Sequence, residues 1–72
     1  MKRQIKVNAI SDATKIVQMA ANVNGDVIIT KGKYSIDAKS IMGIFSIDLS
    51  QGAVIEYPDD AVELDAFIST LA

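Results

Sequence analysis

Apolar positions repeat along this chain with two different periods, which predict both strands and helices. Short apolar or alternating runs predict strands over residues 4–9, 26–30, 34–38 and 53–57. Apolar residues spaced by three and four positions predict two amphipathic helices, with the stripes Ala13, Ile16, Val17, Ala20 and Leu64, Phe67, Ile68, Leu71. If the second stripe packs on the sheet, Phe67→Ala should cost about 3–5 kcal/mol of stability.

The predicted elements follow one another in the order β-α-β-β-α-β-α. Asn24–Gly25 is expected to end the first long helix, because glycine readily takes positive φ. Lys31–Gly32–Lys33 is expected to form the tight turn of a hairpin. One antiparallel sheet with helices on a single face is the compact arrangement of such elements, so the sequence predicts a single α+β domain spanning residues 1–72.

Two helix starts carry residues typical of N-terminal caps. Ser11 is expected to cap the first helix, with Asp12 placing negative charge in its first turn. Asp60 and Glu63 have the spacing of a capping box at the start of the last helix, with Asp in place of Ser or Thr.

Composition places the chain among small globular proteins. Of its 72 residues, 50% are hydrophobic and 22% are charged, which argues against disorder. No apolar run is long enough to cross a membrane, and the basic Met1–Arg3 is not followed by the apolar segment of a signal peptide. The cytoplasm is therefore the expected location.

Charge is distributed unevenly along the chain. The net charge of −2 argues against nucleic acid as the main partner. All seven basic residues lie within the first 39 positions, whereas the chain from Asp48 onward holds six acidic residues and no basic one. A solvated surface accounts for this asymmetry more simply than a basic side that steers an acidic partner, although both interpretations stay open.

Several kinds of chemistry are absent from the sequence. The chain has neither Cys nor His, so it offers no thiolate ligand and no imidazole base. The C-terminal carboxylates lack the spacing of a metal-binding loop, and the four glycines are too scattered for a phosphate loop. We therefore expect a non-enzyme without a metal or cofactor.

The stretch around Ser40 is the most informative part of the sequence. Ser40 stands directly before an apolar run, where a helix cap belongs. A period of 3.6 places Ile41, Ile44 and Phe45 roughly on one side and turns Met42 away. A helix this short has too little surface to bury all four side chains. The exposed part is either a docking surface or, in the simpler interpretation, a plug for the core.

Lys39–Ser40–Ile41–Met42–Gly43 resembles the KSIMG segment of HPr, the phosphocarrier of the bacterial sugar phosphotransferase system. From Ala13 to Tyr57 the chain is similar to that family without a gap, including at Val17–Gln18, Asp26–Val27, Gly32–Lys33 and Gly52–Ala53. The resemblance implies the open-faced β-sandwich of HPr, in agreement with the pattern of elements.

One motif of the family is missing. In HPr-like carriers the phosphate-accepting His stands just before the first helix, in a motif resembling G-[IL]-H-[AS]-R-P. Here the corresponding residues 8–12 are Asn-Ala-Ile-Ser-Asp, without His, Arg or Pro. Phosphate transfer through histidine is therefore expected to be lost. An acyl phosphate on Asp12 is the remote alternative, and helix capping explains that residue more simply.

The resemblance gives Ser40 a second possible role. In many HPr proteins the corresponding serine is phosphorylated by a dedicated kinase and then acts in carbon-catabolite regulation, and the homologue called Crh keeps this serine without the active His. By that resemblance Ser40 is a possible phosphorylation site, with Lys39, Ile41, Met42 and Phe45 as partner-docking residues. The implied partners are a serine kinase and a transcriptional regulator.

Three features favour other interpretations. The position of Ser40 before an apolar run is explained equally by a helix cap alone. The missing Arg and the presence of Asp48 where the family usually has Gly both depart from the regulatory pattern. The alternative function is structural, in which an HPr-fold domain assembles with itself through the apolar patch.

Overall fold

The computed structural model describes residues 1–45 and 48–71, and its elements follow the predicted order. They are β1 (Lys2–Ile5), α1 (Ile10–Ala20), β2 (Ile28–Lys31), β3 (Tyr34–Asp37), α2 (Ile41–Phe45), β4 (Ala53–Glu56) and α3 (Val62–Ser69). The four strands form one antiparallel sheet in the order β1-β4-β2-β3.

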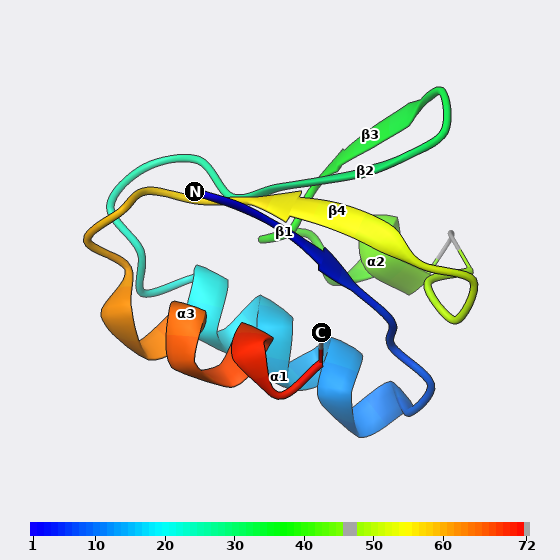
Figure 1. Ribbon diagram of the computed structural model, residues 1–72, viewed down its shortest axis with the longest axis horizontal. Coiled ribbons are helices and arrows are strands. Elements are labelled where there is room, and N and C mark those ends of the chain that lie inside the picture. The colour runs from blue at the N-terminus through cyan, green and yellow to red at the C-terminus, as the bar shows by residue number, and fades with distance from the viewer. Residues whose placement is uncertain (46–47, 72) are drawn as a thin grey trace.

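All three helices form a second layer under this sheet. Figure 1 shows α1 and α3 side by side below the strands, and α1 also contacts α2. In the centre of the sheet, Ile55 of β4 pairs with Arg3 of β1 on one side and with Ile29 of β2 on the other. This arrangement confirms the predicted α+β open-faced sandwich.

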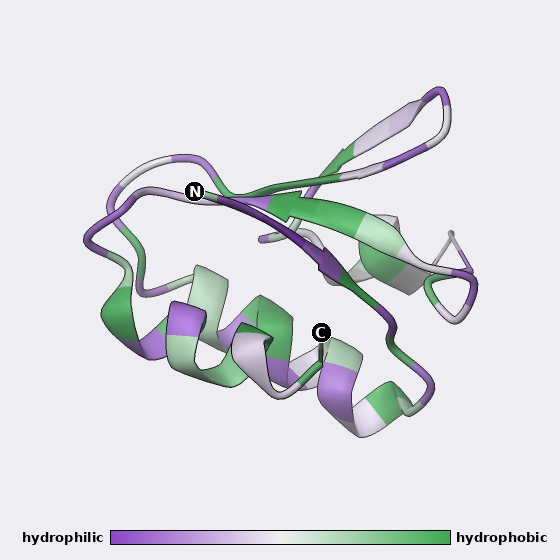
Figure 2. Ribbon diagram, viewed as in Figure 1, coloured by the Kyte–Doolittle hydropathy of each residue, from purple (hydrophilic) through white to green (hydrophobic). Residues whose placement is uncertain are grey.

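The core lies between the sheet and the helices. Strand residues alternate, so that Ile5, Ile29 and Ile55 are buried in the core while Gln4, Thr30 and Glu56 are exposed. Figure 2 shows that hydrophobic residues are concentrated on the central strand β4, whereas the edge strand β1 is mostly hydrophilic. The largest fully buried side chains are Ile5, Ile16, Val27, Ile29, Ile44, Ile55, Leu64 and Ile68. Within the described residues, no helix is long and apolar enough to cross a bilayer.

Helix α1 begins earlier than Ser11 would place it. Its N-cap is Ala9, which makes no side-chain cap, and Ser11 lies inside the helix. The carbonyl of Ala9 already accepts hydrogen bonds from the amides of Asp12 and Ala13, at 3.1 and 3.3 Å. The predicted Ser11 cap is therefore wrong, whereas Asp12 does lie in the first turn.

Helix α3 also begins without a side-chain cap. Its N-cap is Ala61, so the predicted capping box of Asp60 and Glu63 is wrong. The reason is local, since the carbonyl of Asp60 accepts the Val62 amide at 2.9 Å and keeps Asp60 outside the helix. Glu63 lies in the first turn, where its charge complements the helix dipole.

Strand β1 is displaced from the predicted range of 4–9. Beyond Ile5 the chain leaves β4, because the Lys6 amide donates to the carbonyl of Leu71 and the Val7 amide donates to that of Leu49, both at 3.1 Å. The first of these bonds ties the end of β1 to the segment after α3.

A three-residue polar cluster also joins β1 to α3. The Arg3 Nε atom lies 2.8 Å from Oδ1 of Asp65 and 3.1 Å from the Tyr57 hydroxyl, which itself donates to Asp65. Hydrogen bonds from Tyr57 and Arg3 lower the pKa of the Asp65 carboxyl. Burial, followed by the bond to Asp65, raises the pKa of Tyr57.

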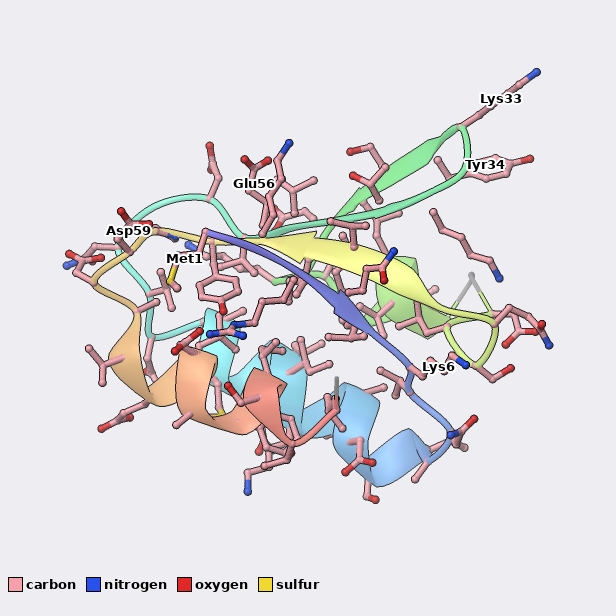
Figure 3. The ribbon with its side chains drawn as sticks, viewed as in Figure 1. Met1, Lys6, Lys33, Tyr34, Glu56 and Asp59 are labelled. Atoms are coloured by element: carbon pink, nitrogen blue, oxygen red, sulfur yellow. The ribbon has the colours of Figure 1, made fainter. Side chains whose placement is uncertain are left out.

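The hairpin of β2 and β3 turns at Gly32–Lys33. Gly32 has a φ of 58°, whereas the φ of Lys33 is not positive. This combination is typical of a two-residue turn whose first central position needs glycine. Figure 3 shows Lys33 and Tyr34 projecting from the hairpin tip, away from the body of the protein. Tyr34 is accordingly 69% exposed.

Candidate functional site

Ser40 caps α2, as its position before the apolar run predicts. Its Oγ accepts the Gly43 amide at 3.2 Å, and its carbonyl accepts the Ile44 amide at 3.1 Å. The Ser40 amide in turn donates to the Asp37 carbonyl at 3.0 Å, which joins the helix to the end of β3. Ser40 itself is exposed, so its hydroxyl is accessible from solvent.

The charges beside Ser40 have both signs. Asp37 accepts the Lys39 amide on its Oδ1 at 2.9 Å, which brings a carboxylate to the chain just before the helix. The Lys39 ammonium extends to the segment after α1, where it donates to the Val23 carbonyl at 3.1 Å. Lys39 is thus exposed next to Ser40, but its charge is held on the side toward Val23.

Helix α2 divides its apolar residues between the core and the surface. Ile44 is 1% exposed and belongs to the core, whereas Met42 is 79% exposed, as its angular position predicts. The side chains of Ile41 and Phe45 lie outside the part of the chain that the structure describes. Of the four predicted docking side chains, the structure therefore places Lys39 and Met42, both at the surface.

A hollow of about 310 Å³ lies beside α2, at the start of α1. It is lined by Val7, Asn8, Ala9, Ile10, Ala13, Ile44, Asp48, Leu49 and Ser50. Ile10, in the first turn of α1, is 76% exposed. Because α1 contacts α2, two exposed apolar side chains, Ile10 and Met42, stand on neighbouring helices. Sequence analysis missed Ile10, although its place outside the buried stripe of α1 was a usable signal.

The rim of this hollow carries negative charge. Oδ1 of Asp48 accepts the Ser50 amide at 2.9 Å and the Ser50 hydroxyl at 2.5 Å, and these bonds lower the pKa of the Asp48 carboxyl. The Lys31 ammonium donates to the backbone carbonyl of Asp48. No Lys or Arg stands among the residues that line the hollow. The hollow at the start of α1 therefore offers an anion a carboxylate in place of a cationic side chain.

The remaining carboxylates do not gather into a metal site. Over residues 1–45 and 48–71, no group of three or more acidic side chains is placed to hold a metal ion. Asp12 is half-buried in the first turn of α1, and its amide donates to the Ala9 carbonyl. Asp12 thus lies at the start of the helix. In the described part of the chain, its carboxyl makes no hydrogen bond or ion pair with another titratable group.

Comparison with known proteins places this arrangement in a defined group. Residues 10–69 match the family model described as the PTS HPr component phosphorylation site. The crystal structure of HPr-C-His from Thermoanaerobacter tengcongensis is similar with a TM-score of 0.76 and 25% identity, over 97% of this chain and 92% of that one. The phosphocarrier protein HPr of Bacillus anthracis str. Ames has a TM-score of 0.68 and 26% identity, over 100% and 96% of the two chains. The histidine-containing phosphocarrier protein of Mycoplasma shares the fold, with a TM-score of 0.74 at 17% identity, over 97% and 89% of the chains.

Proposed function

Because the chain belongs to the HPr family, we propose that it is a member that binds protein partners without transferring phosphate through histidine. One observation carries this proposal. The family is defined around a phosphorylation site, and the 72 residues contain no His. At the start of α1 the N-cap is Ala9, whose methyl group has no atom that accepts a phosphoryl group.

The electrostatics of the hollow support the same conclusion. A phosphoryl group held at the start of α1 needs cationic partners besides the backbone amides. The lining residues supply the ionised Asp48 instead, which would repel the phosphate. The missing imidazole and the carboxylate among the lining residues thus point in the same direction.

Incubation with phosphoenolpyruvate and the general energy-coupling enzyme tests the loss of transfer. We expect no labelled phosphate on this protein, while a histidine-containing HPr is labelled in the same mixture. The variant Ala9→His places an imidazole at the N-cap of α1 and reports whether the energy-coupling enzyme still recognises the surface. Acid-labile phosphate on the unsubstituted chain would refute the proposal.

The finer proposal is that a serine kinase phosphorylates Ser40 and that a transcriptional regulator binds the product. Ser40 is exposed, and its Oγ already lies at the N-terminus of α2. Phosphorylation would add about −1.5 to −2 charges there, close to the exposed Met42. The partner would then recognise a phosphate beside an apolar side chain.

Intact-mass spectrometry after incubation with ATP and an HPr-type serine kinase tests Ser40. We expect one added phosphate on the parent chain and none on Ser40→Asn. The asparagine side chain keeps a cap acceptor without a hydroxyl, so it separates phosphorylation from folding. Ser35→Ala, at an exposed serine of β3, is the matched control and should still gain phosphate. Phosphate on Ser40→Asn would place the modification elsewhere.

Self-assembly through the same surface is the second candidate, favoured by the exposure of Ile10 and Met42 on adjacent helices. Light scattering over a concentration series measures it. Association that Met42→Ser abolishes would support this candidate, whereas a monomeric mass at every concentration would count against it.

A further inference from the structure

A second site of chemistry lies at the opposite end of α1 from the hollow, in the segment that leads to β2. Asn24 is followed by Gly25, both residues are exposed, and neither belongs to a helix or a strand. We propose that Asn24–Gly25 is a site of spontaneous deamidation in the folded protein. The reaction needs no partner and is independent of the function proposed above.

The reaction is an attack of the backbone on the neighbouring side chain. The Gly25 nitrogen loses its proton to solvent and bonds to the side-chain carbonyl carbon of Asn24. The C–N bond of the side-chain amide breaks, and ammonia leaves with a proton from solvent, so that a five-membered succinimide remains. Water then opens the ring. Attack at the former side-chain carbonyl gives Asp, and attack at the main-chain carbonyl gives isoaspartate.

The local structure leaves both reacting groups available. Within the described part of the chain, neither the Asn24 side chain nor the Gly25 amide makes a hydrogen bond. Hydrogen-bonded amides in helices and strands are held away from such an attack. Gly25 also has no Cβ to obstruct the approach of its nitrogen to the side chain before it.

The other asparagine in this segment is protected. The Asn22 side chain donates to the Gln18 carbonyl at 3.4 Å. The next residue is the β-branched Val23, and its amide donates to the Ala20 carbonyl at 3.0 Å. Deamidation of Asn22 is therefore hindered both by the bulk of Val23 and by hydrogen bonds, and neither hindrance applies to Asn24. We expect Asn24 to deamidate faster than Asn22.

Packing explains why glycine occupies the labile position. Gly25 has a φ of 134°, and a Cβ atom there would lie 3.0 Å from Cγ of Pro58. Figure 1 shows that the segment after α1 and the segment before α3 run along the same end of the molecule. A larger residue at position 25 would strain the backbone and push against this neighbouring segment, so the fold requires the residue that makes Asn24 reactive.

Deamidation would change the charge of a hollow between α1 and α3. This hollow has a volume of about 380 Å³, and Asn24 lines it together with Asp60 and Glu63. The product carboxylate would face these two acids, and the net charge of the chain would become one unit more negative than −2. The aged protein would thus carry a more acidic surface beside the start of α3.

Incubation of the native protein at mildly alkaline pH, followed by isoelectric focusing and peptide mapping, tests the site. We expect an acidic variant to accumulate, with Asp and isoaspartate both located at residue 24. The Asn24→Gln variant should stay unmodified because its longer side chain disfavours ring closure, while Asn22→Gln should age like the parent chain. A synthetic peptide of residues 16–31 sets the rate for an unfolded segment, and the native rate should fall within an order of magnitude of it.

Two results would overturn the proposal. One is a native protein that keeps its amide while the peptide loses it, which would mean that the fold protects Asn24. The other is an acidic variant that also forms in Asn24→Gln, which would place the reaction at another residue.

Discussion

Adjacent residues of α3 provide a direct test of how this helix packs. Ile68 is fully buried against the sheet, whereas Phe67 is only partly buried at the edge of the core. Truncation of a buried Ile to Ala costs about 2–5 kcal/mol, since the remaining cavity adds to the lost burial. A 72-residue chain has a total stability of about 4–11 kcal/mol, so Ile68→Ala removes a large part of it.

The neighbouring substitution Phe67→Ala should be milder. Replacing a fully buried Phe by Ala costs about 3–5 kcal/mol, and the partly buried Phe67 should lie toward the low end of this range. Part of this loss is the contact with Lys15, whose Nζ lies 4.8 Å from the ring centroid, a pair that contributes about 0.5–1 kcal/mol at an exposed position. The structure therefore lowers the sequence-based expectation for Phe67.

Urea denaturation of both variants measures the difference. We expect Ile68→Ala to lose more stability than Phe67→Ala, with similar m-values. The melting temperature of Ile68→Ala should fall by at least about 8 °C. An equal or larger loss in Phe67→Ala would mean that α3 presents a different face to the sheet.

Three further outcomes follow from individual contacts. Ser40→Ala should lose about 1 kcal/mol of stability in urea denaturation while Ser40→Asn loses only a small part of this, and equal losses would contradict the cap. Because the pKa of Asp65 is lowered in the folded state, its contribution is complete above its ordinary pKa of 3.8 and is lost as pH falls through the lower folded value. Asp65→Asn should thus flatten the acid side of the stability profile, and an unchanged acid slope would exclude this carboxyl as its source. Met42→Ser should change the unfolding free energy by less than about 0.5 kcal/mol, and a larger loss would show that Met42 is buried.

The sequence predicts the architecture because apolar periodicity is recorded along the chain itself. The stripe of α1 buries Ala13, Ile16 and Ala20, as the spacing requires. Ser40 also caps as expected, since its acceptor and the Gly43 amide are only three residues apart. Such features depend on residues that are close together in the sequence, so the order of the residues is enough to predict them.

The incorrect predictions concern residues whose position is decided by distant contacts or by competing backbone bonds. Ser11 and Asp60 have good capping side chains, but α1 has its N-cap two residues before Ser11, at Ala9, and α3 has its N-cap one residue after Asp60, at Ala61. Strand β1 ends at Ile5 because the Lys6 amide meets Leu71, a residue far along the chain.

The candidate site shows the same division. Exposure of Met42 follows from the angular spacing within one helix, whereas the contact that makes α1, with its exposed Ile10, a neighbour of α2 is a tertiary one. The direction of the Lys39 ammonium also depends on the Val23 carbonyl, 16 residues earlier in the chain. Neither of these contacts between distant parts of the chain can be predicted from the pattern of residues along the sequence.

The strand order has a consequence for synthesis on the ribosome. β4 is the last strand to be made, yet it lies between β1 and β2 in the sheet. Until residues 53–56 leave the exit tunnel, β1 has no strand partner, and the contacts available to the emerging chain are those within α1, within the β2–β3 hairpin, and of α2 with α1 and β3. Closing a loop of about 50 residues must precede the β1–β4 pairing, which makes this step slow relative to local structure. The nascent chain therefore exposes Ile5 and one edge of β2 until β4 has emerged.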